Sequence, residues 1–578
     1  MRLSWTTLLL PCVLADTVTL NWSIGWKWLA PDGVGRPVVT VNQQWPAPQI
    51  SLTEGDRLIL HVTNNLGNET TSIHFHGIFQ KGDNEMDGPV GVTQCPIPPG
   101  STFTYDFRVD QVGTYWWHAH GGGQIADGLR GAFVIRANRP PYRDQITGSG
   151  DLVITTGDWF HDQAPYLIRY YQSVENNEQN GGAEPIPDSG LINDGQDIQM
   201  RVDADKTYLL RVVNIGNFVG TYLEIDGHDL TIVEVDGVYT EPYTLKTLYL
   251  SVGQRYAVLL KTKKSSDNTN YLIKCALDLN MFDDVPAGYD PNYYGYLVYN
   301  TRKPLPSKAP ITDLTIFDDL DLVTSNANRY GQNREYENVD RQIILDMDFT
   351  TMSGVNRAII NNVTYVSQKV PTLYTALSTG KSASNPLVYG VNSIPFVIKH
   401  NDVVEVIINN HDSGGHPWHL HGQTFQVIAR TPADGGLYAG QKLTARHPNP
   451  LRRDVVSVSE GAFVAIRFKA DNPGVYLMHC HIEWHVEAGL TATMIVAPDQ
   501  MQSRSSTIHI PGDHVDACRR QGIPTQGNAA GNTQDFLNLT GANTQFDLNP
   551  SGAVIDPSTL GPPGKQRAYW PKKKKDRH

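Results

Sequence analysis

Two widely separated stretches of this sequence repeat one another around pairs of histidines. The segment VGTYWWHAHGGGQIADGLRGAFVI, which begins at Val112, aligns with PGVYLMHCHIEWHVEAGLTATMIV, which begins at Pro473. TSIHFHGIFQ, from Thr71, aligns in the same way with HPWHLHGQTFQ, from His416. A repeat of this kind indicates that one folding module occurs more than once in the chain.

The repeated module is predicted to be a β-sandwich. Short runs of alternating apolar and polar residues are separated by Gly, Pro, Asn and Asp, which is typical of strands in stacked sheets. Helical periodicity is scarce, so we expect an all-β chain. The clearest runs are residues 57–65, 102–109, 207–214, 256–263, 403–410 and 463–470.

The chain has 578 residues, too many for a single core. Residues 207–237 have the strand rhythm of the repeat without a histidine pair, which indicates a further copy in the middle. We therefore predict three consecutive β-sandwich domains, near residues 16–140, 145–305 and 340–500. A polar tail over 501–578 follows and ends in four lysines at 572–575, a solvated basic terminus.

Each repeat contains two His-X-His pairs. Because residues i and i+2 of a strand lie on the same face, each pair directs two imidazoles at one place. Four such pairs, in a chain with 19 histidines, predict a cluster of several metal ions between the first and third domains, with copper the best candidate. The eight histidines are His74, His76, His118, His120, His419, His421, His479 and His481.

The later repeat contains the residues for a second metal site. His416, Cys480 and His485 supply two imidazoles and a thiolate, the trigonal set of a blue copper site whose fourth ligand is weak. The first repeat has different residues at these three positions, namely Thr71, Ala119 and Gln124. We therefore expect a single electron-accepting copper, located in the third domain.

At these motifs the chain resembles the multicopper oxidases, closely and over nearly its whole length. HFHG, HAH, HPWHLHG and HCHIEWHVEAGL match the four copper-ligand segments of that family. The resemblance implies cupredoxin-like domains, four copper ions, and O2 as the acceptor that is reduced to water. It assigns the type 1 copper to His416, Cys480 and His485, the type 2 copper to His74 and His419, and the two type 3 coppers to His76, His118, His120, His421, His479 and His481.

The resemblance implies further residues around the copper ions. Leu490 falls at the axial position of the type 1 site, where the family associates the absence of methionine with a high reduction potential. Asp87 and Glu483 resemble the acids beside the cluster that supply protons for oxygen reduction. The family pattern also pairs Cys95 with Cys518, which would leave Cys275 as a buried free thiol.

The ends and the charge of the chain predict an exported protein. A basic residue, a short apolar stretch and small residues before Asp16 indicate a removable signal peptide over 1–15. No later stretch is long and apolar enough to span a membrane. We expect a secreted, extracellular protein, or one associated with the cell wall or the secretory pathway. The net charge of -12 argues against a nucleic-acid partner, and sequons at Asn21, Asn68, Asn362 and Asn538 permit N-glycosylation.

Within the family the resemblance is to the fungal branch that holds ferroxidases and laccase-like pigment oxidases. Glu184 matches the ferroxidase carboxylate that binds Fe(II), and Tyr365 matches a nearby tyrosine. Asp434 loosely meets the second iron carboxylate, in a segment of different length. The acidic residues that resemble iron-handling patches are Asp283, Asp284, Asp318, Asp319 and Asp321.

A phenol is the competing substrate. Asp188, five residues before Asn193, stands in DSGLIN, which resembles the laccase segment whose acid accepts a phenolic proton. Ferroxidases that work with an iron permease usually carry a C-terminal membrane helix, and this chain ends in a short basic tail. We therefore predict a laccase-type oxidase of phenolic pigment or secondary-metabolite precursors. The alternatives are a ferroxidase, with an iron permease as partner in that case, and a non-catalytic copper-binding protein.

Overall fold

The computed structural model describes residues 15–267, 269–329, 331–546 and 553–560. The predicted signal peptide, apart from Ala15, and the lysine-rich end therefore lie outside the described residues. Within the described ranges, no helix combines the length and the apolarity needed to cross a lipid bilayer.

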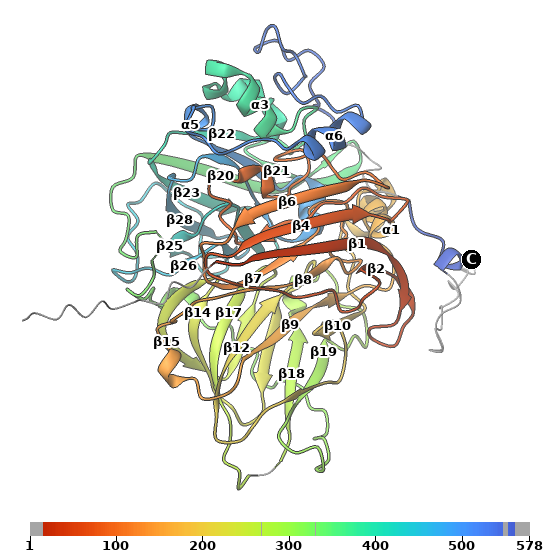
Figure 1. Cartoon of the computed structure of the whole chain (residues 1–578), viewed down its shortest axis with the longest axis vertical. Coiled ribbons are helices and arrows are strands. Elements are labelled where there is room, and N and C mark those ends of the chain that lie inside the picture. Colours follow the sequence, from red (N-terminus) through yellow and green to blue (C-terminus); the bar gives the residue numbers. More distant parts are fainter. Residues whose placement is uncertain (1–14, 268, 330, 547–552, 561–578) are drawn as a thin grey trace, which may run out of the picture.

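The first domain is a sandwich of two four-stranded sheets, β2-β1-β4-β6 and β3-β8-β7-β5. Its strands occupy the middle of the molecule in Figure 1. They are β1 (Thr17–Leu29), β2 (Arg36–Val41), β3 (Ile50–Thr53), β4 (Arg57–Asn64), β5 (His74–His76), β6 (Thr102–Arg108), β7 (Gly113–His118) and β8 (Arg130–Arg136).

The second domain lies at the bottom of Figure 1 and has sheets of order β10-β9-β12-β17-β14-β15 and β11-β19-β18-β13-β16. Two short helices, α1 (Ala164–Tyr171) and α2 (Val174–Asn180), follow its first strand. Its strands are β9 (Asp151–Trp159), β10 (Ser189–Ile192), β11 (Ile198–Arg201), β12 (Thr207–Asn214), β13 (Thr221–Ile225), β14 (Leu230–Val235), β15 (Val238–Leu245), β16 (Thr247–Leu250), β17 (Arg255–Lys261), β18 (Tyr271–Leu277) and β19 (Asn292–Val298).

The third domain has sheets of order β21-β20-β23-β28-β25-β26 and β22-β30-β29-β24-β27. Helices α3 (Thr372–Ser378) and α4 (Glu483–Ala488) belong to it. Its strands are β20 (Arg341–Met352), β21 (Val355–Ile360), β22 (Pro395–Ile398), β23 (Val403–Asn410), β24 (His416–Leu420), β25 (Phe425–Arg430), β26 (Arg452–Arg453), β27 (Val455–Val458), β28 (Phe463–Lys469), β29 (Gly474–Cys480) and β30 (Thr491–Val496).

The repeat seen in the sequence is a repeat of strand topology. The first strand of each domain pairs in parallel with a later strand, as β1 with β4, β9 with β12, and β20 with β23. That later strand then pairs antiparallel with β6, β17 or β28. The all-β prediction of three consecutive cupredoxin-like sandwiches is therefore confirmed, and the middle domain is a full copy of the module.

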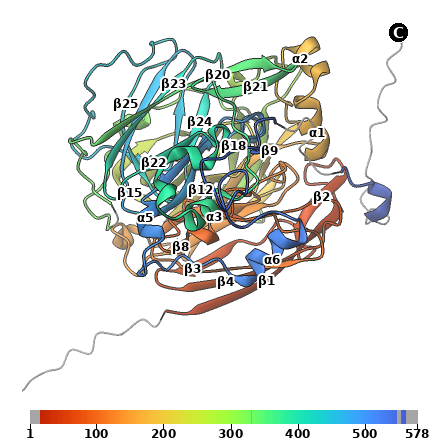
Figure 2. The same ribbon diagram turned by 90° about the horizontal axis from the view of Figure 1, so that it is seen from above.

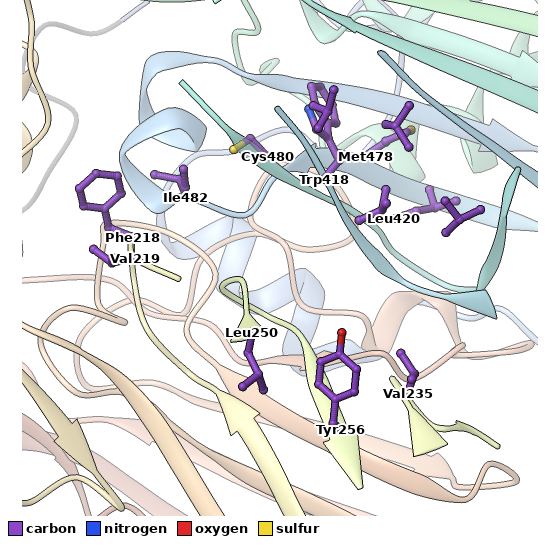
Figure 3. Close-up of a cluster of buried hydrophobic side chains, with 14 of the residues drawn as sticks. Phe218, Val219, Val235, Leu250, Tyr256, Trp418, Leu420, Met478, Cys480 and Ile482 are labelled. Atoms are coloured by element: carbon purple, nitrogen blue, oxygen red, sulfur yellow. The ribbon is translucent and has the colours of Figure 1, made fainter. Parts of the chain in front are cut away.

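Buried apolar side chains join the second and third domains into one continuous core. Phe218, Leu250 and Tyr256 of the second domain belong to the same buried cluster as Trp418 and Cys480 of the third, and Figure 3 shows the two groups in one close-up. The first domain has its own core around Phe75 and Trp117. Cys480, one of the predicted copper ligands, thus belongs to a core that the second domain helps to build.

Residues 507–520 are folded against the first domain rather than extended. Helix α5 (Pro498–Met501) is followed by α6 (Gly512–Arg520), which lies beside β6, and Figures 1 and 2 place it along the strands of the first domain. A disulfide joins Cys95 to Cys518, as the family pattern implied. Cys275 is buried and free. The expected polar tail therefore begins with a covalently anchored segment.

Candidate metal centres

The four His-X-His pairs meet at the boundary of the first and third domains. In the first domain β5 pairs with β7 so that His74 stands opposite His118. In the third domain β24 pairs with β29 so that His419 stands opposite His479. The same register in both copies carries each pair to the same place. The ring nitrogens then form three groups, within which they lie no more than 4.8 Å apart: His76 with His118 and His481, His120 with His421 and His479, and His74 with His76 and His419.

Backbone carbonyls orient these imidazoles. The Nδ1 atoms of His74 and His419 donate to the carbonyls of Asp87 and Asp454, at 2.6 and 2.8 Å. His118 and His479 donate in the same way to Ala119 and Cys480, at 2.7 and 2.8 Å. A hydrogen bond at one ring nitrogen leaves the other free to bind a metal, so Nε2 is the inward-facing atom in these four rings.

The donor set fits copper. Among the described residues, the buried Nε2 atoms of His74, His118, His120 and His419 have no hydrogen-bond partner. Buried polar atoms without a partner are costly unless a ligand satisfies them. Burial, and then the neighbouring histidines, hold the pKa of His120, His419 and His421 well below the usual value, so these imidazoles are neutral, as metal binding requires.

The second site is a buried triangle of two imidazoles and a thiol. The Cys480 Sγ atom lies 3.4 Å from His485 Nδ1 and 3.7 Å from His416 Nδ1, and the two nitrogens are 3.1 Å apart. Leu490 is fully buried beside it, and its backbone carbonyl accepts from the Cys480 amide. Burial raises the pKa of the Cys480 thiol, so a bound cation is needed to hold the thiolate.

The corresponding place in the first domain is closed by a hydrogen bond. The Thr71 hydroxyl donates to Gln124 Oε1 at 2.7 Å, and the Gln124 amide donates to Glu69 at 2.9 Å. Ala119, at the position of the cysteine, is buried. The polar groups of Thr71, Gln124 and Glu69 thus bond to one another, and Ala119 offers no thiolate. This arrangement agrees with the predicted single blue site.

Of the two predicted proton donors, Asp87 contacts histidines of the cluster, and Glu483 bonds to the backbone of the first domain. Asp87 Oδ2 is 2.8 Å from His421 Nδ1, and its Oδ1 is 3.4 Å from His74 Nδ1. Glu483 Oε1 accepts the Gly123 amide at 3.1 Å. Burial, and then the nearby Glu487, raise the pKa of Glu483 to about 8, so this carboxyl can hold a proton at neutral pH.

Two carboxylates cover the outward-facing nitrogens of the blue site. Glu184 Oε1 accepts from His485 Nε2 at 2.7 Å, and Asp412 Oδ2 accepts from His416 Nε2 at 3.0 Å. Asp283 lies against Glu184 and hydrogen-bonds with it. Sequence reasoning missed Asp412, although it stands four residues before His416 in a tight turn whose Gly414 amide it also accepts.

The loop that carries Glu184 requires a glycine. Gly182 has φ of 84°, and a Cβ atom there would lie 2.4 Å from the Cβ of Asn356 on β21. A side chain at this position would push the loop off the third domain. The glycine therefore lets the loop after α2 press close to β21, so that Glu184 reaches His485.

Asp434 and Asp188 lie in other surroundings. Asp434 is exposed, and its backbone amide bonds to the Glu460 carbonyl in a surface turn. It was expected to loosely meet the second iron carboxylate, but the acid that contacts a blue-site imidazole is Asp412. Asp188 accepts the His161 amide at 2.7 Å, and no contact with the blue-site histidines is found for it among the described residues.

The remaining acids and Tyr365 divide between two places. Tyr365 lies against the residue that precedes Leu490, because its amide bonds to the Gly489 carbonyl at 3.2 Å. Asp284 is exposed next to Asp283. The expected iron-handling patch at Asp318, Asp319 and Asp321 is instead an ion-pair cluster. Its arginine partners are Arg430, Arg446 and Arg453.

Comparison with known proteins agrees with this geometry. Multicopper oxidase family models match residues 23–140, 150–302 and 365–500. An iron transport multicopper oxidase of Gibberella zeae is 44% identical over 542 residues, which cover 93% of this chain and 85% of the relative. A protein of Saccharomyces cerevisiae with the same description is 41% identical over 549 residues, covering 93% and 84%.

Solved structures give the same result. The crystal structure of Fet3p, a multicopper oxidase that functions in iron import, matches with a TM-score of 0.86 at 39% identity, over 92% of this chain and 99% of that one. A laccase from Botrytis aclada matches with a TM-score of 0.72 at 27% identity, over 88% and 92%. The chain therefore belongs to the multicopper oxidase family, whose members are copper-dependent oxidoreductases that use O2.

Proposed function

We propose that this protein is a ferroxidase, which oxidises four Fe(II) ions to Fe(III) while one O2 and four protons become two waters. When bound, the copper ions supply the electron transfer and the oxygen reduction. The observation that carries the proposal is the pair of carboxylates, Glu184 and Asp412, each hydrogen-bonded to a blue-site imidazole. This replaces the laccase-type function that we expected from the sequence.

The carboxylates form a cation-binding edge. Carboxylate oxygens are ligands that suit a hard cation such as iron. Burial raises the pKa of Glu184, and burial together with Glu184 raises the pKa of Asp283 to about 7. Glu184 and Asp283 share a proton, which a cation can displace. Fe(II) can therefore bind here in place of the proton.

The same carboxylates define the path of the electron. Burial opposes ionisation of Asp412, but the hydrogen bond from His416 prevails and lowers its pKa to about 2. An ionised Asp412 stabilises Fe(III) more than Fe(II), because the product carries the greater charge. Fe(II) held by Glu184 or Asp412 is one hydrogen bond away from an imidazole that faces the blue site.

The phenol-oxidase alternative has weaker support. Asp188, its proposed proton acceptor, is engaged with His161 through both its carboxylate oxygens, at 2.7 Å to the backbone amide and 3.4 Å to Nδ1. The laccase comparison has lower identity than the comparisons with proteins of iron transport and import.

Export completes the proposal. The Cys95–Cys518 disulfide is typical of an oxidising compartment, and the sequon residues Asn21, Asn362 and Asn538 are exposed. The protein would then act outside the cytosol and deliver Fe(III) to an iron permease, in keeping with the description of its relatives as iron transport oxidases.

Stopped-flow reduction of the oxidised blue protein tests this function. Fe(II) and a simple phenol are each tested as the electron donor. The proteins compared are the wild type, Glu184→Ala and Asp188→Ala. We expect Fe(II) to bleach the blue site faster than the phenol, and Glu184→Ala to slow the Fe(II) reaction by more than about tenfold, as loss of a charge-assisted contact predicts. A faster phenol reaction that depends on Asp188 would overturn the proposal.

A further inference from the structure

Among the described residues, no histidine of the second domain belongs to the metal centres, yet this domain touches them directly. A turn between β16 and β17 places Gly253 against the cluster, where a Cβ atom would lie 3.1 Å from His76 Cε1 and 3.1 Å from His481 Cδ2. The same turn is held to the third domain by Ser251, whose hydroxyl lies 2.6 Å from that of Ser457.

Arg255, two residues further on, joins all three domains. Its guanidinium binds both oxygens of Asp454 in the third domain, at 2.5 and 2.7 Å. Its Nε donates to the Thr114 carbonyl of the first domain at 3.0 Å, and it lies over the ring of Tyr115. Both Arg255 and Asp454 are buried, so the pair is shielded from competing water.

Asp454 is the residue through which this arginine reaches the cluster. Its Oδ1 lies 3.2 Å from Nε2 of His76, and its backbone carbonyl accepts from Nδ1 of His419. One residue therefore supports a ligand from the first domain and another from the third. The sequence offered no sign of this role, because Asp454 lies far along the chain from His76 and Arg255.

His76 presents a different ring nitrogen to the cluster than His118 and His479 do. His118 and His479 use Nδ1 for outer hydrogen bonds, whereas His76 uses Nε2 and turns Nδ1 inward, 3.1 Å from His481 Nε2. The carboxylate of Asp454 can fix the ring orientation of His76 only if the carboxylate has a fixed position. The two hydrogen bonds from Arg255 fix the plane of this carboxylate.

We propose that the second domain forms one wall of the trinuclear cluster, the site of the type 2 and type 3 copper ions. In this wall Arg255 is a positioning residue that orients His76 through Asp454. Gly253 leaves room for the rings of His76 and His481. This role is independent of the electron donor, so it stands apart from the ferroxidase proposal. It requires that the cluster change when Arg255 or Gly253 is altered, while the blue site keeps its properties.

Arg255→Lys tests the positioning role, because it keeps the charge and loses the two-pronged contact. Arg211→Lys is the matched control, since Arg211 is another buried arginine of the second domain that pairs with acids and contacts Thr114, without touching Asp454. Each purified protein is examined for copper content, blue absorption, electron paramagnetic resonance of the cluster, and the separate rates of blue-site reduction and reoxidation by O2.

We expect Arg255→Lys to retain blue absorption and its rate of reduction, to show an altered cluster spectrum, and to be reoxidised about tenfold or more slowly. The control should match the wild type in all four measurements. An unchanged cluster in Arg255→Lys, or an equal change in Arg211→Lys, would overturn the proposal.

Gly253→Ala provides a second test that applies even where Arg255→Lys does not fold. Gly227→Ala is its control, because Gly227 also has a positive φ in the second domain, at 69° against 82°, and an added Cβ meets Tyr271 and Lys263 at 3.4 Å or more. Gly253→Ala should lose cluster copper while keeping the blue site. Full cluster occupancy with an unaltered spectrum in Gly253→Ala would contradict the proposed wall.

Discussion

The carboxylate of Glu184 lies 2.7 Å from Nε2 of His485, so a loop of the second domain covers a blue-site ligand of the third. Asp412 makes the equivalent contact with His416 from within the third domain. Both imidazoles thus have one nitrogen directed at the blue site and the other at an acid. The acids form the outer boundary of the redox centre, where a cationic donor would arrive.

Asp412→Asn should weaken Fe(II) oxidation while the copper sites remain loaded. The substitution keeps the size of the side chain and removes the negative charge beside His416, so Fe(III) is less stabilised at this edge. We expect kcat/KM for Fe(II) to fall about tenfold to a hundredfold, and the reduction potential of the blue site to rise because a nearby negative charge is lost. Steady-state kinetics and redox titration measure the two effects.

Asp434→Asn is the informative comparison for that experiment. Asp434 occupies an exposed turn, so its substitution should leave Fe(II) kinetics close to those of the wild type. If Asp434→Asn lowered kcat/KM and Asp412→Asn did not, the acid predicted from sequence would be the correct one.

Asp87→Ala should slow the return of the reduced enzyme to its oxidised form. The carboxylate bonds to His421 and lies near His74, so it belongs to the oxygen-reducing cluster and is remote in function from the blue site. We expect reoxidation by O2 to be about tenfold to a hundredfold slower. Blue-site reduction by Fe(II), recorded in the same instrument without O2, should be unaltered. Equal reoxidation rates in the two proteins would show that Asp87 has no such role.

Removal of the Cys95–Cys518 disulfide should lower stability more than activity. The bridge spans a sequence separation of 423 residues and anchors α6 to the first domain, and neither cysteine is among the predicted copper ligands. The double variant Cys95→Ser/Cys518→Ser should unfold with a free energy lower by about 2–5 kcal/mol. Thermal unfolding followed by circular dichroism measures the loss, and an unchanged unfolding temperature would mean that packing of α6 alone is sufficient.

Glu85→Gln should change how stability depends on pH. Glu85 is buried with one carboxylate oxygen lacking a partner among the described residues, and burial raises its pKa from the usual 4.5 to about 8. The folded state therefore binds this proton more tightly than the unfolded state. The contribution of this proton to the free energy of unfolding is fully present below about pH 4.5 and is lost as the pH rises toward 8.

The glutamine of the variant has no proton to lose. The free energy of unfolding of the variant should therefore exceed that of the wild type by up to about 3 kcal/mol at pH 7, and the two values should converge near pH 4.5. Denaturant unfolding at several pH values gives the difference, with the exposed Glu178→Gln as a control. A constant difference between Glu85→Gln and the wild type across this range would show that Glu85 does not titrate as described.

Local periodicity accounts for what could be predicted from the sequence. The alternation of residues 403–410 and 463–470 becomes the antiparallel pair β23 and β28, and the period of two in each His-X-His pair brings both rings to one face. The blue-site residues could be found because they occupy aligned positions of a repeat whose other copy has Thr71, Ala119 and Gln124. These features depend on neighbours within one strand or one module.

Features that depend on distant partners could not be predicted. Asp318, Asp319 and Asp321 looked available for iron because their arginine partners lie more than a hundred residues away. Asp412 and Asp454 are single acids without a motif, and their roles appear once the turn at 410–414 and the boundary of the domains are in place. The choice of Asp434 followed a family spacing that a segment of different length does not preserve.

The turn at Gly253 and the two sets of histidines belong to parts of the chain that are synthesised at different times. A nascent chain that has completed two domains holds His74, His76, His118 and His120 and the wall beside them, without the four later histidines. Metal delivery during synthesis would meet half a cluster, open to solvent and to uncontrolled reaction with oxygen. The complete set of eight histidines therefore exists only once the third domain has been synthesised and has folded against the first.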